Sequence, residues 1–184
     1  MSRSPYFFVE RFDRQTQAYE LQHPLIWNYE HTKRVTADLF PYNGCHEMFS
    51  IVESSRPYNP YPNMKGIHRN LPKNVCNDIA KAFDECSWET TLNGEKSIVT
   101  PNAYWFTYAD MYIYLLETPT VVDYDAMEEA DDEGDEDIFG NKEEIRKPNP
   151  LNALKERVDA FLNVCDDWDW ENDYSLIRIV YWIL

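Results

Sequence analysis

The chain of 184 residues is 43% hydrophobic and 15% aromatic, and this length suits one domain with a sizeable core. Its 33 Asp and Glu outnumber 17 Lys and Arg, so the formal net charge is −16, which disfavours direct binding to nucleic acid or anionic membranes and favours basic protein partners. The sequence contains neither G-x-x-x-x-G-K-[ST] nor G-x-G-x-x-G, and this excludes the common phosphate-binding motifs of nucleotide-binding proteins.

The first part of the chain predicts a hairpin, a helix and a loop. Residues 6–12 and 17–21 are rich in aromatic and β-branched side chains and flank a polar turn, which predicts a β-hairpin. Apolar residues at helical spacing predict a helix within residues 45–52. Three prolines fall within residues 57–64, which predicts a Pro/Tyr-rich loop with polyproline character.

Three later segments have the apolar spacing of core-facing helices. The first lies within residues 71–86. The second begins at Thr107, where Asp110 three residues later suggests a capping box. The third begins after Asn149, which can cap a helix that has Pro150 at its first position. The side chains expected to face the core in these helices are Val75, Ile79, Ala82, Phe83, Cys86, Met111, Tyr114, Leu115, Leu151, Leu154, Val158, Leu162 and Cys165.

Residues 175–184 contain one charge, Arg178, among β-branched and aromatic side chains, which predicts a central, mostly buried strand. Together these elements predict an α+β fold: a single small domain over residues 1–184, with one mainly antiparallel sheet covered by about three helices. Residues 120–149 are interpreted as an acidic insertion or linker inside this domain, with an acidic surface loop. We expect one core cluster that includes Val9, Ile79, Phe83, Leu115, Leu162, Ile179 and Tyr181.

The cysteines and the N-terminus indicate the compartment. Cys45, Cys76, Cys86 and Cys165 include no C-x-x-C pair, so buried free thiols are expected. The N-terminus lacks the apolar stretch of a signal peptide, and no apolar run approaches the roughly 18 residues of a membrane-spanning helix. We therefore expect a cytoplasmic protein.

The histidines predict no catalytic centre. Among the four, only His46 has a suggestive neighbour, Glu47, at a helix start. A metal or acid–base site needs clustered ligands at fixed spacing, which the sequence does not display. We expect no catalytic residue, no metal site and no cofactor, and a protein that is not an enzyme.

Five stretches together resemble a family of small, uncharacterised proteins of bacteriophages and prophages. They are similar to the family's Tyr-Val-Glu strand, aromatic-rich segment, Arg-Gly-Leu-Pro turn, Ser-Trp-Leu-Thr helix start and Val-Arg-Ile-Val-Phe-Trp closing strand, in the same order. The stretches are YFFVE (6–10), GCHEMFSIV (44–52), HRNLPKNV (68–75), NAYWFTYADM (102–111) and LIRIVYWI (176–183). The family's histidines ahead of Trp-Leu-Thr are replaced here by Pro101, Asn102 and Ala103. If those histidines serve a metal or catalysis in the relatives, this chain lacks them. The resemblance implies a phage origin and a shared fold more than a particular chemistry.

Residues 123–137 hold ten carboxylates and no Lys or Arg. One interpretation is a solvated loop that keeps the protein soluble; the other is an electrostatic decoy for a basic groove. B-form DNA carries one charge per ~1.7 Å, and the segment would carry one per ~2.2 Å as a helix but one per ~5 Å when extended. Such a concentration of charge can also raise the rate of association with a partner, even when the segment has no fixed conformation.

A second acidic segment, residues 166–174, interleaves carboxylates with tryptophans and a tyrosine. Such a segment could insert into a basic groove of a partner, or it could be a loop whose tryptophans pack beneath the edge of the sheet. The burial of large aromatic side chains favours the second interpretation.

The leading hypothesis from the sequence is a phage-encoded inhibitor in the host cytoplasm. It would bind a basic host protein that handles nucleic acid, such as a defence nuclease or its targeting complex, and it could act as an anti-CRISPR protein or DNA mimic. The alternative is an interaction or structural module whose acidic loop is only a solvated linker. The expected partner-binding residues are Asp123, Asp125, Glu128, Glu129, Asp131, Asp132, Glu133, Asp135, Glu136, Asp137, Asp166, Asp167, Trp168, Asp169, Trp170 and Glu171.

Overall fold

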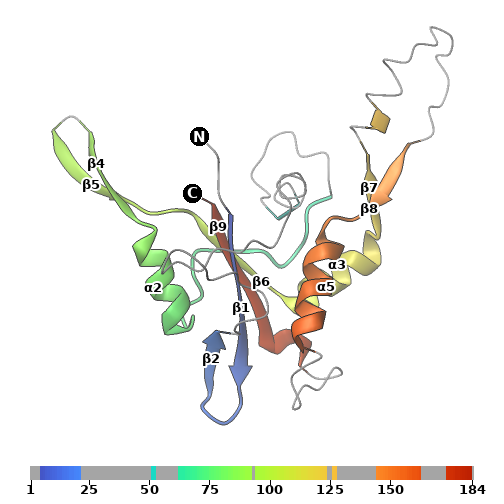
Figure 1. Ribbon diagram of the computed structural model, residues 1–184, viewed down its shortest axis with the longest axis horizontal. Coiled ribbons are helices and arrows are strands. Elements are labelled where there is room, and N and C mark those ends of the chain that lie inside the picture. The colour runs from blue at the N-terminus through green and yellow to red at the C-terminus, as the bar shows by residue number, and fades with distance from the viewer. Residues whose placement is uncertain are drawn as a thin grey trace, which may run out of the picture.

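A computed structural model describes residues 5–21, 51–52, 62–92, 94–123, 126–127, 144–162 and 173–183 (Figure 1). None of the helices in these ranges is long and apolar enough to cross a membrane. The elements in chain order are β1 (Pro5–Asp13), β2 (Ala18–Leu21), β3 (His68–Arg69), α2 (Asn77–Glu85), β4 (Trp88–Leu92), β5 (Glu95–Val99), β6 (Ala103–Thr107), α3 (Tyr108–Glu117), β7 (Thr120–Val122), β8 (Arg146–Pro148), α5 (Leu151–Leu162), the 3-10 turn η1 (Tyr174–Leu176) and β9 (Ile177–Ile183).

The main sheet has five strands in the order β2-β1-β9-β6-β3, and all its pairings are antiparallel. The predicted C-terminal strand is at its centre, where Ile179 lies opposite Val9 of β1 and opposite Phe106 of β6. Its side chains from Ile177 to Trp182 are all buried. The predicted α+β class, with a mainly antiparallel sheet and three helices, is confirmed.

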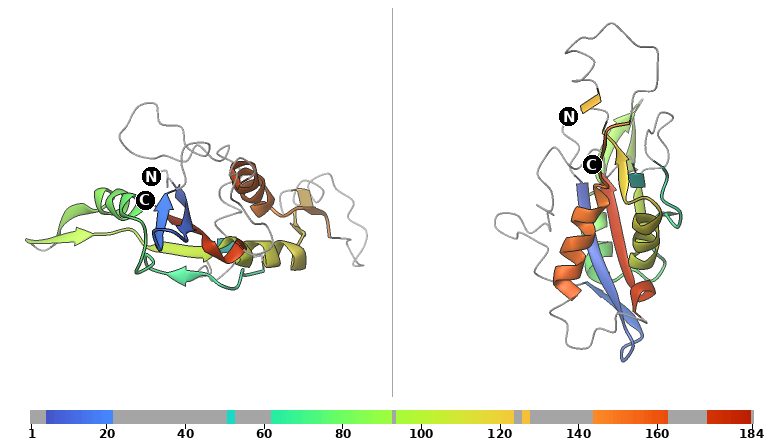
Figure 2. Two further views of the ribbon diagram at one scale, coloured as in Figure 1. Left: turned by 90° about the horizontal axis from the view of Figure 1, so that it is seen from below. Right: turned by 90° about the vertical axis from the view of Figure 1, so that its right-hand side faces the viewer.

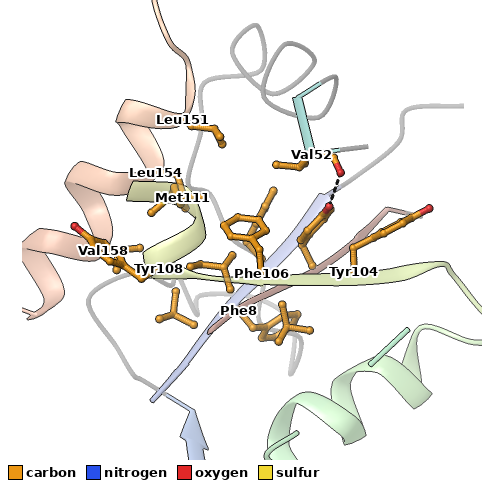
Figure 3. Packing of buried hydrophobic residues seen from close by; sticks show 14 of the residues in the cluster. Phe8, Val52, Tyr104, Phe106, Tyr108, Met111, Leu151, Leu154 and Val158 are labelled. Atoms are coloured by element: carbon orange, nitrogen blue, oxygen red, sulfur yellow. Dashed lines mark hydrogen bonds between the residues drawn. The ribbon is translucent and has the colours of Figure 1, made fainter. Parts of the chain in front are cut away.

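Aromatic side chains cover one face of the sheet in a row that crosses three strands. The ring of Tyr181 on β9 stacks on Phe7 of β1 at 5.2 Å and on Tyr104 of β6 at 5.5 Å between centroids. The Tyr181 hydroxyl donates to the carbonyl oxygen of Val52 at 2.9 Å, which ties residues 51–52 to the sheet (Figure 3). Stacked rings of this size contribute buried area together with a preferred geometry.

Helices α3 and α5 pack on this same face beside Phe106 (Figure 3). As predicted, Thr107 and Asp110 form a capping box at the start of α3, with the Asp110 amide donating to Thr107 Oγ1 at 3.1 Å. The predicted cap at Asn149 is also present, because the Leu151 amide donates to Asn149 Oδ1 at 3.0 Å. The predicted core-facing side chains that the structure describes in the two helices are buried, namely Met111, Tyr114, Leu115, Leu151, Leu154 and Val158, and Tyr108 at the start of α3 is buried as well although it was not predicted.

Helix α2 covers the opposite face. There Phe8 stacks on Trp182 at 4.6 Å, and Phe83 of α2 meets the Trp182 ring edge-on at 5.2 Å. Both faces of β9 are therefore covered, which explains why its sequence is apolar without alternation.

Two pairs of strands extend from this body at opposite ends of its long axis (Figures 1 and 2). The hairpin β4–β5 follows α2, and its exposed apolar side chains include Trp88 and Ile98. The ribbon β7–β8 follows α3 and leads into α5. Neither pair is part of the five-stranded sheet.

Several expectations from the sequence need correction. Phe83 is only partly buried, because it lies on the last turns of a helix at the rim of the sheet. The helix expected within residues 71–86 begins only at Asn77, because the preceding residues form turns. Ser175 and Leu176 belong to η1 and not to the strand. The free thiols of Cys76 and Cys86 are buried as predicted, whereas Cys45, Cys165 and the side chain of Leu162 lie outside the described residues.

A glycine is required where the chain passes the start of α3. Gly66 has φ +85°, a left-handed conformation that side-chain-bearing residues rarely adopt. A Cβ atom at this position would also overlap the carboxyl group of Asp110. Glycine at position 66 therefore allows the segment before β3 to lie directly against the capping box.

Candidate functional site

The predicted acidic insertion is carried by a two-stranded ribbon. Val122 of β7 lies opposite Arg146 of β8, and the Asp123 amide donates to the Ile145 carbonyl oxygen at 2.7 Å just beyond the pair. The ends of the range that we interpreted as a linker, residues 120–149, are thus strands. The chain leaves the ribbon and returns to it at adjacent points, so everything between is tethered to one end of the molecule.

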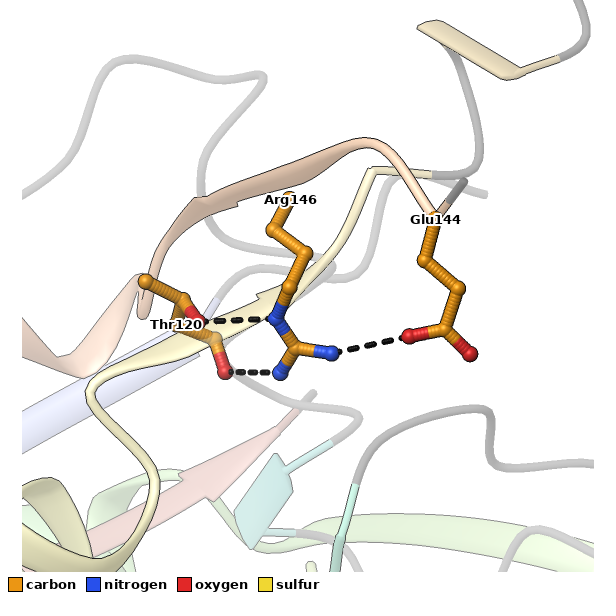
Figure 4. Close-up of polar contacts among 3 residues, drawn as sticks. All are labelled: Thr120, Glu144 and Arg146. Carbon is orange, nitrogen blue, oxygen red and sulfur yellow. Dashed lines mark hydrogen bonds and ion pairs between the residues drawn. The ribbon is translucent and has the colours of Figure 1, made fainter. Parts of the chain in front are cut away.

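The contacts of Arg146 with described residues lie within the base of the ribbon (Figure 4). Arg146 donates from Nε to Thr120 Oγ1 at 2.9 Å and from Nη2 to the Thr120 carbonyl oxygen at 2.8 Å. Its Nη1 donates to Glu144 Oε2 at 2.9 Å. One guanidinium therefore links both strands and one flanking carboxylate.

The neighbouring lysine makes a second link across the ribbon. Lys147 Nζ lies 3.0 Å from Asp123 Oδ1, and each side chain is 22% exposed. Asn149 continues the attachment, since its Nδ2 donates to the Thr118 carbonyl oxygen at 2.8 Å. The base of the acidic segment is thus fixed to the end of α3 and the start of α5.

Only Asp123 of the predicted partner-binding residues belongs to the described part of the chain. It accepts hydrogen bonds from Lys147 and from the Ala126 amide at 3.3 Å, so it contributes to the ribbon base. The other predicted residues lie outside the described ranges, and their role in binding stays a prediction: Asp125, Glu128, Glu129, Asp131, Asp132, Glu133, Asp135, Glu136, Asp137, Asp166, Asp167, Trp168, Asp169, Trp170 and Glu171.

A second polar group lies inside the fold, on the face of the sheet that α2 covers. Glu10 of β1 and Arg178 of β9 are cross-strand neighbours that form an ion pair, and they are only 0% and 4% exposed. The Arg178 guanidinium lies 3.3 Å from the centroid of the Tyr19 ring and 5.4 Å from that of Trp105. Its face-on position over Tyr19 is the geometry of a cation–π interaction.

The ion pair also binds the segment between β3 and α2. Arg178 Nη1 donates to Asn74 Oδ1 at 2.8 Å and Nη2 donates to the Asn74 carbonyl oxygen at 3.2 Å. The Cys76 amide donates to Glu10 Oε2 at 2.9 Å. Each member of the pair therefore holds a different residue of this segment.

Burial is the largest cause of the pKa shifts of these groups. It raises the pKa of the Glu10 carboxyl above its ordinary value, although the Cys76 amide and Arg178 act in the opposite direction. Burial also raises the pKa of the Cys76 thiol to about 11 and raises that of Tyr19. Cys76 and Tyr19 are therefore neutral at physiological pH.

A third polar network joins α3 to α5. The Tyr108 hydroxyl donates to Asp159 Oδ1, and Lys155 Nζ lies 2.5 Å from Asp159 Oδ2. Burial and then the Asp159 carboxylate raise the pKa of Tyr108. This tyrosine is a hydrogen-bond donor that stays protonated, and its contacts indicate a role in joining the two helices.

Two hollows in the described surface are large enough for a small ligand. A hollow of about 360 Å³ lies beside α3, between Lys65 and Glu117. Another, of about 260 Å³, lies at the turn between β1 and β2, where Arg14 pairs with Asp173. Within the described ranges, no three His, Cys, Asp or Glu side chains are grouped as metal ligands would be.

The sequence did not predict the buried Glu10–Arg178 ion pair or the ion pairs that Arg146 and Lys147 form at the base of the ribbon. A lone charge within an apolar strand is the signal for the first, since Glu10 follows YFFV and Arg178 stands within LIRIV. The ribbon had a weaker signal, because β7 and β8 each contain three residues. Its adjacent cations, Arg146 and Lys147, are separated from the acidic run by residues 138–145 in the sequence.

Comparisons with protein-family models, with curated proteins and with solved structures found no match.

Proposed function

We propose that this chain is a non-enzymatic, phage-encoded inhibitor that acts in the host cytoplasm by binding a basic host protein that handles nucleic acid. The partner class is a defence nuclease or its targeting complex. The acidic segment of residues 123–137 is the binding element, and residues 166–171 form a second acidic patch. The observation that carries the proposal is the attachment of the densest negative charge of the chain to a fixed ribbon at one end of the molecule.

The cations of the ribbon do not neutralise the acidic segment as a whole. Arg146 pairs with Glu144, and Lys147 pairs with Asp123, so these two cations offset only two carboxylates at the base. Ten carboxylates occur in residues 123–137 without a Lys or Arg among them. The remaining charge produces a negative potential that attracts a basic groove and raises the association rate.

The ribbon also fixes where the acidic run is attached. Because the Asp123 amide and the Ile145 carbonyl oxygen are hydrogen-bonded, both ends of the chain segment that carries the run start from one point of the molecule. A concentrated charge of this kind competes with a nucleic-acid backbone for the same basic groove without copying its geometry. Nucleic-acid mimicry is the stronger form of the proposal.

A second candidate is an interaction module whose acidic segment only keeps the protein soluble. The internal pairing of Asp123 with Lys147 favours it, because it gives the one described carboxylate of the segment a structural partner. Under this alternative, recognition would use an apolar surface such as the exposed Trp88 and Ile98 of the β4–β5 hairpin.

The two candidates are separated by neutralising the acidic segment. We would change Asp131, Asp132, Glu133, Asp135, Glu136 and Asp137 to Asn or Gln and compare the variant with the unmodified protein in pulldowns from host lysate, read by mass spectrometry. Under the inhibitor proposal, the unmodified protein captures nucleic-acid-binding proteins, free DNA displaces them, and the neutralised variant loses them. Capture should also weaken as salt rises, because exposed charges are screened over ~8 Å at physiological ionic strength.

A matched control removes the same charge from the body of the protein. It changes exposed carboxylates that are remote from the ribbon to amides, namely Asp78, Asp84, Glu85, Glu89, Glu95 and Glu156. This variant should retain the captured proteins, since its acidic segment is intact. Equal capture by the segment-neutralised variant and the unmodified protein, at matched salt, would refute the proposal and leave the interaction module.

A further inference from the structure

We propose that the Glu10–Arg178 pair is a proton-sensitive latch that holds the connection between β3 and α2, residues 70–76, onto the sheet. The inference concerns the conformation of this connection and does not depend on the acidic segment. Two buried charges, one on β1 and one on β9, each bind backbone or side-chain atoms of the same short segment.

The segment has few other polar attachments to the sheet among the described residues. The Asn70 amide donates to the Ala103 carbonyl oxygen at 2.8 Å at its start. Asn74 and Cys76 then bind to Arg178 and Glu10. Lys73 and Asn74 are exposed between these points. The ion pair is thus the attachment at the end of the segment that leads into α2.

The latch responds to the ionisation of Glu10. A carboxylate accepts a stronger hydrogen bond from the Cys76 amide than a neutral carboxyl group does, and it attracts the Arg178 guanidinium. Protonation weakens both interactions, but it also removes the larger cost of burying the charge. Arg178 keeps the Tyr19 ring and Asn74, so the cation still has partners when Glu10 is neutral.

The groups around Glu10 permit it to titrate alone. Arg178 faces it from β9, Tyr19 from β2 and Cys76 from the start of α2. Tyr19 and Cys76 have raised pKa values and stay neutral in mild acid, while Arg178 stays charged. The raised pKa of Glu10 means that the folded protein accepts this proton more readily than the unfolded chain does. Lifting the connection off the sheet would hydrate Glu10, so mild acid favours the closed connection, and ionisation of Glu10 as pH rises loosens it without unfolding the domain.

The direct test is a pH titration of the ¹⁵N-labelled, full-length protein by NMR. The Cys76 amide resonance should shift with a midpoint above the ordinary glutamate value of about 4.3. After correction for intrinsic rates, the amides of residues 74–76 should exchange faster above that midpoint, while the amide of Val180 on β9 keeps its protection. A Cys76 resonance that does not titrate between pH 4 and 8 would overturn the proposal, and this result needs no variant.

Two variants assign the effect to the latch. Glu10→Gln keeps the shape of the side chain and should abolish the titration of the Cys76 amide, whereas Glu89→Gln, in the exposed pair with Lys96 on the β4–β5 hairpin, should leave it intact. Asn74→Ala removes an exposed contact of Arg178 and should accelerate exchange at residues 74–76 at every pH. A titration that persists in a folded Glu10→Gln variant, or unchanged exchange in Asn74→Ala, would contradict the latch.

Discussion

At the scale of single residues, the Glu10–Arg178 pair is the main departure from an apolar sheet. Two buried charges lose their hydration, and their mutual attraction offsets that loss only partly. The surrounding contacts with Tyr19, Asn74 and Cys76 offset a further part of it, although Arg178 Nε has no hydrogen-bond partner among the described residues. Such a pair contributes less to net stability than to the choice of one register between β1 and β9, because a shift by one residue would separate the charges.

Removing one member of the pair should be costly, whereas removing both should not. Glu10→Ala leaves Arg178 buried without its counter-charge and should lower the free energy of unfolding by about 3–5 kcal/mol. The double change of Glu10→Leu and Arg178→Met replaces both charges with apolar groups of similar size and should recover most of that loss. Urea denaturation of the single and double variants checks this, and a double variant that is no more stable than Glu10→Ala would contradict it.

The same carboxyl gives the stability a dependence on pH. Because the pKa of Glu10 is higher in the folded protein than in the unfolded chain, its stabilising contribution is complete below the ordinary glutamate value and is lost as pH rises through the raised value. The stability of the unmodified protein relative to Glu10→Gln should therefore fall with rising pH across this window. Urea denaturation at a series of pH values measures the difference, and a difference constant from pH 4 to 8 would show that Glu10 titrates normally.

At the scale of secondary-structure elements, local signals predicted the helices better than the strands. The cap residues Thr107 and Asn149 fixed the starts of α3 and α5 because capping needs only neighbours in the chain. The hairpin β4–β5 was missed although Asn93 and Gly94 are a recognised hairpin turn signal, because its strands are polar and have no buried face to give an apolar pattern. β6 was missed because its five residues run directly into α3, so that its last residue, Thr107, is also the helix cap.

The non-local contacts could not be predicted from the sequence. The ion pair joins strands at opposite ends of the chain, and the sequence offers no rule that pairs Glu10 with Arg178 before the strand order is known. In the candidate site, the acidic residues were evident from composition. Their attachment to a ribbon was not, because β7 and β8 are too short to show a period.

The capping box of α3 provides a test at this scale. Thr107→Ala removes the hydroxyl that accepts a hydrogen bond from the Asp110 amide and donates one to the Asp110 carboxylate. The change should lower the free energy of unfolding by about 1 kcal/mol. Thr107→Ser keeps the hydroxyl and should recover most of that loss in thermal or urea denaturation. Equal losses in both variants would mean that the threonine methyl group, and not the cap, matters here.

Two phenylalanines allow a comparison of the fully buried core with its partly buried edge. Phe106 is fully buried, and Phe106→Ala should cost about 3–5 kcal/mol of unfolding free energy. Phe83 is only partly buried against Trp182, so Phe83→Ala should cost roughly half as much. Denaturation of the two variants under one set of conditions gives the ranking, and the reverse order would show that α2 is more deeply packed than this structure indicates.

At the scale of the whole molecule, a formal net charge of −16 is unfavourable for a compact chain because like charges repel. The variant that neutralises six carboxylates of the acidic segment should therefore be at least as stable as the unmodified protein at low salt. The difference should shrink as added salt screens the repulsion. Thermal melting at several salt concentrations checks this, and a large loss of stability at low salt would mean that the segment contributes to the folded core.

The position of β9 at the centre of the sheet also sets the order in which the molecule can be assembled. Val9 pairs with Ile179, and β6 reaches β1 only through β9. During synthesis at roughly 5–20 residues per second, the part of β1 before Glu10, which does not pair with β2, must remain without β9 for on the order of ten seconds. A sheet closed by contacts of such large sequence separation also folds slowly in solution. The nascent chain thus exposes Phe7, Phe8 and Val9 for most of its synthesis, and chaperones that bind extended apolar segments have this stretch as a substrate until β9 arrives.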